Sequence, residues 1–275
     1  MALPAPPLTL VVSDVYGPVV QGDGPRTGRR CSVIRLGGCN LSCGWCDSPQ
    51  TWDGGRYELS AELTERLVRN VVVEALAPQP GLVVVTGGEP LLQQRREGWA
   101  LLLEGLSGVE TELETNGTLP PTEETLAAVT HFLVSPKLAH AGDPAWMRIR
   151  SDVLRGWGRM AAHGRADFSF VVRDLSDVST VGALAELHEL PTDRIWVVPE
   201  GRVGTHVREG VRQLAEIVLE SGFNLSTRLT VSLWGAAMKP DGQGRAEAGQ
   251  LPATGPLPLP DPGLSSMARR FVTRR

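Results

Sequence analysis

Three cysteines lie within eight positions of the chain, at Cys39, Cys43 and Cys46, with the spacing C-x3-C-x2-C. Three thiolates this close in sequence suit a soft, thiolate-binding metal centre such as an iron–sulfur cluster. A [4Fe–4S] cluster has four irons, so three cysteines leave one iron open to bind a small molecule directly. The spacing therefore predicts an iron–sulfur centre with an open coordination position.

Other uses of cysteine fit this pattern less well. A structural zinc site needs four Cys or His ligands, yet no histidine falls between residues 30 and 53. Four cysteines in 275 residues do not make a disulfide framework. A ferredoxin-type carrier would use a C-x2-C-x2-C run and a fourth cysteine. The remaining Cys31 lies in an apolar segment and is predicted to be a small core residue, not a ligand.

Length and charge exclude several classes of protein. A chain of 275 residues can form a single domain of α/β-barrel size. Its net charge of −4 gives no electrostatic footprint for nucleic acid or an anionic membrane. The first residues contain prolines and no basic stretch, so no signal peptide is expected, and no apolar run approaches the roughly 18–20 residues that span a bilayer. We therefore expect a cytoplasmic protein, because thiolates stay reduced there.

Strand and helix signals alternate along the chain. Strands are predicted at residues 9–13, 32–36, 82–85, 110–113, 131–134, 168–172, 195–198 and 228–233, and the segment at 82–85 is a continuous apolar run. Helical periodicity is found at residues 60–76, 97–106, 122–129, 178–190 and 206–221. This alternation implies a parallel sheet with right-handed crossovers. About six βα units are fewer than the eight of a closed barrel, so the fold class predicted is α/β, with a partial, open (β/α)6-like barrel.

Polar residues follow four of the predicted strands, at Thr86, Glu114, Ser135 and Pro199. Parallel α/β folds build their sites at the carboxyl ends of strands, so these positions should converge near the cysteine loop. The core domain is predicted to cover residues 1–235. Residues 236–275 are rich in proline and glycine and end in arginines, which predicts a flexible, solvated tail.

The run Gly-Gly-Glu-Pro at residues 87–90 supplies a second motif. Its glycines let the backbone approach a ligand closely, and Glu89 can accept hydrogen bonds from an ammonium or a ribose hydroxyl group. After an apolar strand and downstream of the cysteines, this run resembles the motif of the radical S-adenosylmethionine (SAM) superfamily that holds the amino end of SAM. The resemblance implies a radical-SAM barrel whose open iron binds SAM.

The resemblance narrows to the 7-carboxy-7-deazaguanine synthase family. It rests on six motifs in order: Gly-Pro-Val-Val-Gln-Gly-Asp-Gly at 17–24, the stretch from Arg35 to Ser48, Thr-Trp-Asp-Gly at 51–54, Thr-Gly-Gly-Glu-Pro at 86–90, Glu-Thr-Asn-Gly at 114–117 and Ser-Pro-Lys at 135–137. The family's reaction contracts the ring of 6-carboxy-5,6,7,8-tetrahydropterin to 7-carboxy-7-deazaguanine and releases ammonia, in queuosine-type 7-deazapurine biosynthesis. In it a 5′-deoxyadenosyl radical from SAM abstracts hydrogen from C6 of the pterin and later recovers it, so SAM acts as a cofactor.

The resemblance also assigns roles to residues of this chain. The [4Fe–4S] cluster would be bound by Cys39, Cys43 and Cys46, and Mg²⁺ by Ser48. SAM would be bound by Trp45, Cys46, Asp47, Gly88, Glu89, Ser135, Pro136 and Lys137. The pterin would be bound by Val20, Gln21, Gly22, Arg35, Thr86 and Glu114. A flavodoxin or ferredoxin reductant and a homodimer are further implications.

The residue chemistry agrees with these roles but leaves structural alternatives open. The fork of Arg35 matches the substrate carboxylate, although the same arginine could form a structural ion pair. Mg²⁺ prefers oxygen ligands and often takes only one or two protein groups, although Ser48 could instead cap a turn. Gln21 and Gly22 could only shape a turn, and Lys137 could be solvated.

Three departures from the family pattern affect the closing side of the pocket. Q-G-E-G reads Gln-Gly-Asp-Gly at residues 21–24, and the usual Lys before Phe-Val-Val is missing at residues 168–172. The late His-Lys-x-x-Trp reads Thr-Val-Ser-Leu-Trp at residues 230–234. Two alternatives stay open: a radical-SAM activase of a glycyl-radical enzyme, which would need no pterin-reading residues, and an iron–sulfur electron carrier, which would not cleave SAM.

Overall fold

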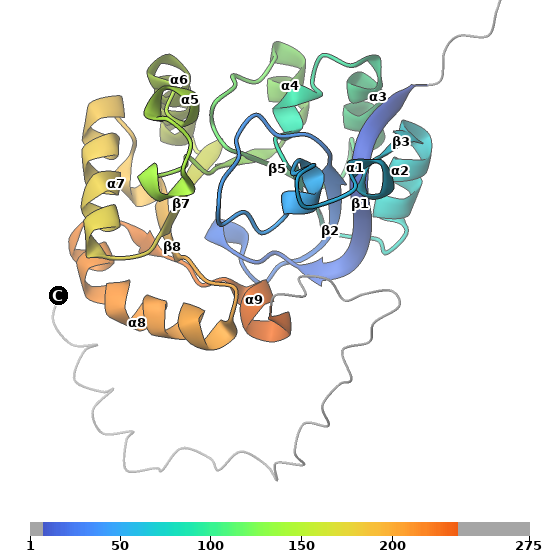
Figure 1. Cartoon of the computed structure of the whole chain (residues 1–275). Helices are drawn as coiled ribbons and strands as arrows, with labels where there is room; N and C mark the ends of the chain where they lie inside the picture. Colours follow the sequence, from blue (N-terminus) through green and yellow to red (C-terminus); the bar gives the residue numbers. More distant parts are fainter. Residues whose placement is uncertain (1–7, 236–275) are drawn as a thin grey trace, which may run out of the picture. The chain divides into compact units, whose positions relative to one another are not determined.

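The structure is a computed structural model that describes residues 8–235. One nine-stranded sheet runs through this part of the chain, in the order β3-β1-β2-β4-β5-β6-β7-β8-β9 (Figure 1). The strands are β1 (Thr9–Val20), β2 (Arg30–Leu36), β3 (Thr64–Leu67), β4 (Leu82–Gly87), β5 (Glu110–Thr115), β6 (His131–Val134), β7 (Ala166–Val172), β8 (Ile195–Pro199) and β9 (Asn224–Leu225). The predicted tail at residues 236–275 lies outside the described residues.

The sheet is parallel from β2 to β9 and antiparallel at its beginning. Each neighbouring pair from β2–β4 to β8–β9 is parallel, whereas β1 is antiparallel to both β2 and β3. The strands curve around an interior, and the two edge strands β3 and β9 do not meet. The prediction of an open, partial α/β barrel is therefore confirmed.

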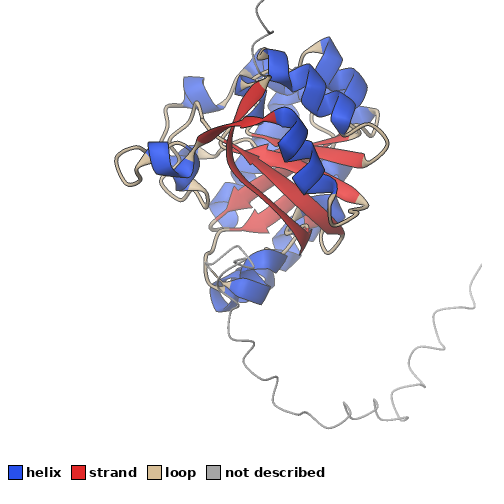
Figure 2. Cartoon of the chain, turned by 90° about the vertical axis from the view of Figure 1, so that its right-hand side faces the viewer, coloured by secondary structure: helices blue, strands red, loops and turns tan. Residues whose placement is uncertain are grey.

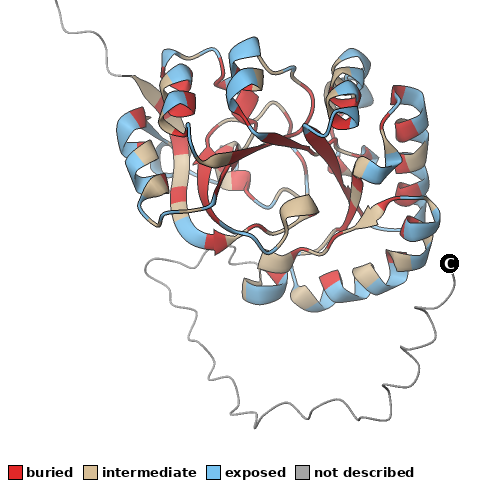
Figure 3. Ribbon diagram, turned by 180° about the vertical axis from the view of Figure 1, so that it is seen from behind, coloured by how far each residue is buried: buried red, intermediate tan, exposed pale blue. Residues whose placement is uncertain are grey.

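Helices cover the outer face of the curved sheet (Figures 1 and 2). They are α1 (Leu59–Glu62), α2 (Val68–Leu76), α3 (Glu97–Gly105), α4 (Glu123–Ala128), α5 (Ala145–Arg148), α6 (Ser151–Ala162), α7 (Leu175–His188), α8 (Gly204–Glu220) and α9 (Leu229–Trp234). The longer helices α2, α3, α6, α7 and α8 bury their inner sides and expose their outer sides (Figure 3). None of the helices in the described part is long and apolar enough to cross a membrane.

Strand alternation divides the side chains between two faces. Successive residues of a strand point to opposite sides of the sheet. On β4, Val83 and Val85 belong to the main core beneath the helices, while Leu82 and Val84 belong to a separate cluster. Both faces of β4 are therefore covered, which explains its continuous run of apolar residues.

Two segments differ from the sequence-based expectation. Residues 60–76 were predicted as one helix, but α1 and α2 flank the strand β3. The edge of β1 offers free backbone groups, and its pairing with β3 from Thr9↔Leu67 to Val12↔Thr64 overrides the helical periodicity. Residues 228–233 were predicted as a strand but form α9, because the short strand β9 takes the edge of β8 before this segment begins.

The strand β1 is longer than its apolar run. It continues to Val20 through Gly17 and Pro18, beyond the strand predicted at residues 9–13. The register of β1 against β2 shifts between Tyr16 and Val19. An irregularity of this kind is where a strand tolerates proline, because no ladder hydrogen bond is needed there.

Candidate functional site

A pocket opens on the inner side of the sheet, among the carboxyl ends of the parallel strands. Of the predicted site residues, the following line it: Val20, Gln21, Gly22, Arg35, Cys39, Cys43, Trp45, Cys46, Asp47, Ser48, Thr86, Gly88, Glu114, Ser135 and Lys137. The other two, Glu89 and Pro136, are buried next to it without lining it. The fold thus brings together segments that are more than 100 residues apart in the sequence.

The cysteine loop, which carries Cys39, Cys43 and Cys46, follows β2. It is held by hydrogen bonds to the segment that follows β6. Asp143 accepts hydrogen bonds from the backbone N–H (3.0 Å) and the hydroxyl (2.7 Å) of Ser42. The N–H of Gly44 donates to the carbonyl oxygen of Ala141 (2.9 Å). No motif in the sequence pointed to Asp143, because its role depends on tertiary placement alone.

The three thiols fit an iron–sulfur cluster. All three line the same pocket. Burial is the main cause of a raised pKa at Cys39, and the nearby Cys43 and Cys46 raise this pKa further. Burial raises the pKa of Cys39 to about 12 and that of Cys43 to about 11, so a metal centre must displace their protons. Among residues 8–235, no three Cys, His, Asp or Glu side chains are placed so as to hold a single metal ion.

The glycines at residues 87 and 88 leave no room for side chains. A Cβ on Gly88 would lie 2.0 Å from the carbonyl oxygen of Gly38 and 2.9 Å from Cβ of Cys39. Gly87 has a φ of 143° and a Cβ there would meet the Leu36 carbonyl oxygen at 2.0 Å. The end of strand β4 therefore packs directly against the end of β2 and the cysteine loop, a contact that the motif alone did not predict; the close approach to a ligand stays a prediction.

Glu89 acts on the pocket through its neighbours. Its carboxylate is fully buried and accepts hydrogen bonds from Thr115 Oγ1 (2.9 Å) and from the N–H groups of Asn116 (2.7 Å) and Leu91 (3.0 Å). Burial raises the pKa of Glu89 to about 7, although these hydrogen bonds act to lower it. Because Thr115 and Asn116 line the pocket, Glu89 fixes the residues that a ligand would touch.

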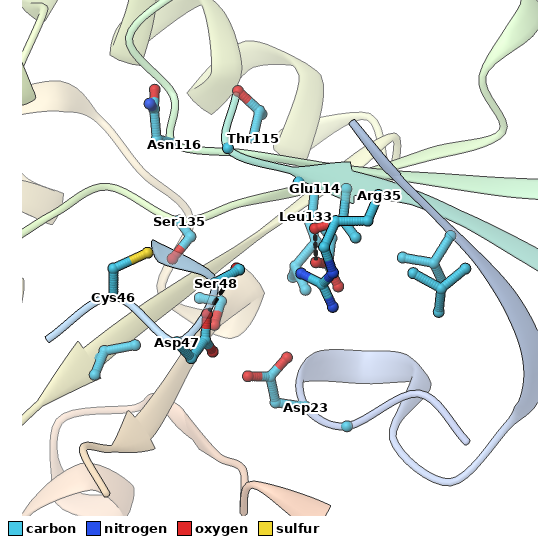
Figure 4. A pocket seen from close by; sticks show the side chains of 18 of the residues that line it. Asp23, Arg35, Cys46, Asp47, Ser48, Glu114, Thr115, Asn116, Leu133 and Ser135 are labelled. Carbon is cyan, nitrogen blue, oxygen red and sulfur yellow. Dashed lines mark hydrogen bonds between the residues drawn. The ribbon is translucent and has the colours of Figure 1, made fainter. Parts of the chain in front are cut away.

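Arg35 and Glu114 lie at one side of the pocket (Figure 4). Arg35 is buried and donates a hydrogen bond from Nη2 to the hydroxyl of Tyr16 (2.9 Å). Glu114 accepts hydrogen bonds from Thr86 Oγ1 (2.6 Å) and Gln21 Nε2 (2.9 Å). Burial, together with nearby acidic groups, raises the pKa of Glu114 to about 7. The site therefore pairs a cationic fork with a carboxyl group that can accept or donate a proton near neutral pH.

Ser48 and Asp47 lie at another side of the pocket, with Asp23 nearby (Figure 4). The Ser48 hydroxyl donates to Oδ1 of Asp47 (3.1 Å), and Arg228 forms an ion pair with Oδ2 of Asp47. Burial acts against ionisation of Asp47, but Arg228 and Arg35 outweigh it and lower the pKa of Asp47 to about 2. Since the serine proton is used, the lone pairs of the Ser48 oxygen are available to a cation.

Lys137 lies beside the aromatic ring of Trp45. Its Nζ donates to the hydroxyl of Ser135 (2.8 Å) and is 5.3 Å from the centre of the Trp45 ring. Arg148 donates to the backbone carbonyl of Lys137 (2.9 Å), which fixes the segment from the other side. Lys137 is thus partly buried and held in place rather than freely solvated.

Sequence reasoning missed several residues that line the pocket, among them Asp23, Asn116, Arg228 and Thr230. Asn116 stands inside the quoted motif at residues 114–117, so that motif could have indicated it. Arg228 and Thr230 follow β9 in a segment predicted as a strand, and no local pattern distinguishes them. Thr230 stands where the family pattern has histidine and packs close to Gly22.

The chain matches known proteins over most of the described part. The model of the radical SAM superfamily matches residues 33–135. The 7-carboxy-7-deazaguanine synthase of Pyrobaculum aerophilum is 34% identical over 79% of this chain and 92% of that protein. The synthase of the same name from Hyperthermus butylicus is 35% identical over 76% and 87%.

A solved structure shares the fold. The crystal structure of QueE from Escherichia coli superposes with a TM-score of 0.57 and covers 79% of this chain and 93% of that one, at 23% identity. At this identity the likeness concerns the arrangement of strands and helices.

Proposed function

The chain belongs to the 7-carboxy-7-deazaguanine synthase family of radical SAM enzymes, and we propose that its pocket carries out the ring contraction for which the family is named. The substrate is 6-carboxy-5,6,7,8-tetrahydropterin, and the products are 7-carboxy-7-deazaguanine and ammonia. The single observation that carries the proposal is the grouping of Arg35 and Glu114 with three cluster thiols around one pocket. Queuosine-type 7-deazapurine biosynthesis is the pathway that consumes such a product.

The cysteine loop and the end of β4 would hold the cluster and SAM. When bound, these two supply a 5′-deoxyadenosyl radical, the reactive species that begins the chemistry. Cys39, Cys43 and Cys46 would bind the cluster, and the backbone of Gly88 would approach SAM closely because it carries no side chain. Trp45, Asp47, Ser135 and Lys137 line the proposed SAM site, and Glu89 and Pro136 support it from behind the pocket wall.

Arg35 and Glu114 would orient the pterin from its two ends. The guanidinium of Arg35 presents a planar fork of N–H donors to the substrate carboxylate. Glu114 can accept hydrogen bonds from the amino-pyrimidine end, with Thr86 held against it by the hydrogen bond of 2.6 Å. Val20, Gln21 and Gly22 complete the proposed pterin site, with Gln21 hydrogen-bonded to Glu114.

Ser48 would bind Mg²⁺ through its hydroxyl oxygen. Its proton already donates to Asp47, whose position is fixed by the ion pair with Arg228. Mg²⁺ keeps several waters and needs few protein ligands, so one hydroxyl oxygen beside a carboxylate suits it. When bound, the ion would supply Lewis-acid chemistry at the substrate oxygens.

The partners follow from the same chemistry. A flavodoxin or ferredoxin would supply the electron that reduces the cluster, and a homodimer is the proposed assembly. The net charge of −4 supports a small-molecule substrate and no direct contact with nucleic acid. An oxygen-sensitive cluster requires reduced thiols, so we place the protein in the cytoplasm.

The proposal is tested with anaerobically reconstituted protein, SAM, Mg²⁺, dithionite and 6-carboxytetrahydropterin. Mass spectrometry should detect 7-carboxy-7-deazaguanine, with SAM not consumed in step with the product. SAM cleavage without any deazaguanine would overturn the substrate assignment and favour another radical-SAM reaction. The absence of both products in protein with a full cluster would favour an electron carrier.

A further inference from the structure

Three glutamates on β5 point toward the inside of the curved sheet. Glu110, Glu112 and Glu114 occupy every second position, and residues so spaced share one face of a strand. Leu113, between two of them, belongs to the core beneath the helices, so the glutamates face the interior. We call these three residues the glutamate ladder. Glu114 lines the pocket, and the other two lie progressively farther from it along the strand.

The ladder binds the segment that connects β1 to β2, residues 21–29. Arg26 donates from Nε to Oε1 of Glu110 (2.9 Å), and its Nη1 lies 3.2 Å from Oε2 of Glu112. Arg29 Nη2 lies 2.8 Å from Oε2 of Glu110. Two arginines of this connecting segment are therefore tied to two successive carboxylates of the ladder.

Gln21 joins the same segment to Glu112 and Glu114, the two glutamates of the ladder nearest the pocket. Its Nε2 donates to Oε1 of Glu112 (2.6 Å) and to Oε1 of Glu114 (2.9 Å). Its Oε1 accepts the N–H of Gly22 (2.7 Å), and the carbonyl oxygen of Gly22 accepts the N–H of Leu229 (2.8 Å). An amide nitrogen has two protons and an amide oxygen two lone pairs. Both N–H groups of the Gln21 side chain are therefore used in hydrogen bonds. The side-chain oxygen of Gln21 and the carbonyl oxygen of Gly22 each keep one free lone pair.

Glu112 is the centre of this network. It is fully buried and is approached by Gln21, by Arg26 and by Nδ1 of His131 (3.1 Å). His131 Nε2 in turn lies 2.8 Å from Oδ2 of Asp167 on β7. Replacing a buried charged network by apolar residues is often neutral or stabilising, so stability alone does not account for it. The hydrogen bonds of this network are directional. They can therefore fix the position of the groups they join, which apolar packing does not do.

We propose that Glu112, Arg26 and His131 are positioning residues for the substrate, because they set the place and orientation of residues 20–22 in the pocket. None of the three lines the pocket itself. The segment they hold presents carbonyl oxygens with free lone pairs, so it recognises N–H groups of the pterin. This inference rests on the proposed function, in which residues 20–22 contact the substrate.

The first test compares Glu112→Gln with His188→Gln. A glutamine at position 112 replaces one carboxylate oxygen by an NH₂ group. This group cannot accept hydrogen bonds, and it faces the donor groups of Gln21, Arg26 and His131. His188 is an equally buried histidine, but it bonds Leu184 and Ser151 in the helical layer and gives a matched control. We expect Glu112→Gln to raise KM for the pterin by about ten- to hundredfold, since small misplacements have effects of this size. The affinity for SAM and the cluster absorbance should not change.

A second measurement follows the segment without any substrate. Hydrogen exchange of the Gln21 and Gly28 amides, which bond Arg29 and Gln21 in the segment, should accelerate in Glu112→Gln and stay unchanged in His188→Gln. Unchanged exchange in Glu112→Gln, with a lower Tm, would overturn the inference and leave the ladder a stability feature. Faster exchange with an unaltered KM would overturn its link to the substrate.

The two proposals fail separately. A reconstituted wild-type enzyme that makes no deazaguanine counts against the proposed function, whereas hydrogen exchange still decides whether the ladder holds residues 21–29. If Glu112→Gln does not fold, Arg26→Lys provides the milder change, because a lysine keeps the charge but cannot bridge Glu110 and Glu112 with a fork. It should raise KM in the same direction by about tenfold, and an unchanged KM would overturn the inference.

Discussion

Strands β2 and β4 turn cysteine, valine and leucine side chains toward the inside of the sheet, whereas β5, β6 and β7 turn glutamate, histidine and aspartate there. The apolar group consists of Val19, Cys31, Val33, Leu82 and Val84. The charged group consists of Glu110, Glu112, His131 and Asp167, with Arg26 from the connecting segment. Both groups lie on the inner side of the same sheet; Val19, Val33 and Val84 of the apolar group line the pocket, whereas the charged group lies behind it.

The two groups differ in what they can determine. Apolar burial is non-directional and scales with the area removed from water, so it stabilises the sheet without fixing any one atom. Hydrogen-bonded charges work only in a narrow range of geometry, and a single lost partner leaves a buried charge uncompensated. The apolar group therefore tolerates changes of shape at the pocket, while the charged group sets the position of the segment that it binds.

The largest expected effect is on stability in the charged group. Glu112→Leu would leave the donors of Gln21, Arg26 and His131 unpaired in the interior, and breaking such a network costs about 4 kcal/mol. Urea unfolding of the reconstituted protein measures the loss. Glu104→Leu, at an exposed position on α3, is the control and should change stability by less than about 0.5 kcal/mol. A loss below about 1 kcal/mol for Glu112→Leu would mean that the interior adapts.

The corresponding change in the apolar group should separate stability from substrate binding. Leu82→Ala removes a fully buried side chain and leaves a cavity, at a cost of about 3 kcal/mol. KM for the pterin should stay as in the wild type, because no hydrogen bond to residues 21–29 is lost. Leu219→Ala on the exposed side of α8 serves as the control. A tenfold rise in KM for Leu82→Ala would remove the distinction between the two groups.

The pH dependence of stability gives a third comparison. Burial disfavours the charged form of His131 and Arg26 opposes it too, but hydrogen bonds to Asp167 and Glu112 outweigh both and raise its pKa above 6.5. A histidine with a raised pKa contributes its full stability below 6.5 and loses it as pH rises through the folded-state pKa. His131→Gln should cost about 2 kcal/mol at pH 6, the value of a hydrogen bond to a charged group, and less at pH 9.

Unfolding free energies of wild type and His131→Gln at four pH values between 6 and 9 check this expectation. His188→Gln is again the matched control, because its ring bonds only a backbone carbonyl and a serine hydroxyl. A difference between His131→Gln and wild type that grows toward pH 9 would contradict a charged His131 in the native state.

The fold could be predicted from the sequence where one periodicity dominates. The valine-rich run of β4 and the alternating β5 were predicted as strands because burial on both faces, or on alternate positions, leaves a local pattern. The segment at residues 60–76 was predicted wrongly because the free edge of β1, which is distant in the sequence, decides its conformation. The parallel pairing of β2 with β4 through to β8 agrees with the predicted alternation of strands and helices, whereas the antiparallel β1 and the edge strands β3 and β9 were not predicted.

The candidate site divides in the same way. The cysteines, the glycines at residues 87–88 and the polar residues after the strands could be predicted because chemistry and spacing coincide in short motifs. Arg228 belongs to no such motif, and its ion pair with Asp47 joins positions that are 181 residues apart. The glutamate ladder was visible as an alternation at residues 110–114, but the sequence does not say which face of the strand is the inner one.

The smallest expected effect concerns Cys31, where the two groups meet. Its thiol is fully buried in the apolar group, and burial, with Glu114 and Glu112 across the interior, raises its pKa to about 12. Unlike the three thiols of the cysteine loop, Cys31 does not line the pocket, so Cys31→Ala should cost about 1 kcal/mol and leave the iron content unchanged. Cys43→Ala, the matched change in the cysteine loop, should lose the cluster. Iron analysis and the visible spectrum of both variants test this prediction. A loss of iron in Cys31→Ala would show that a residue of the apolar group contributes to metal binding.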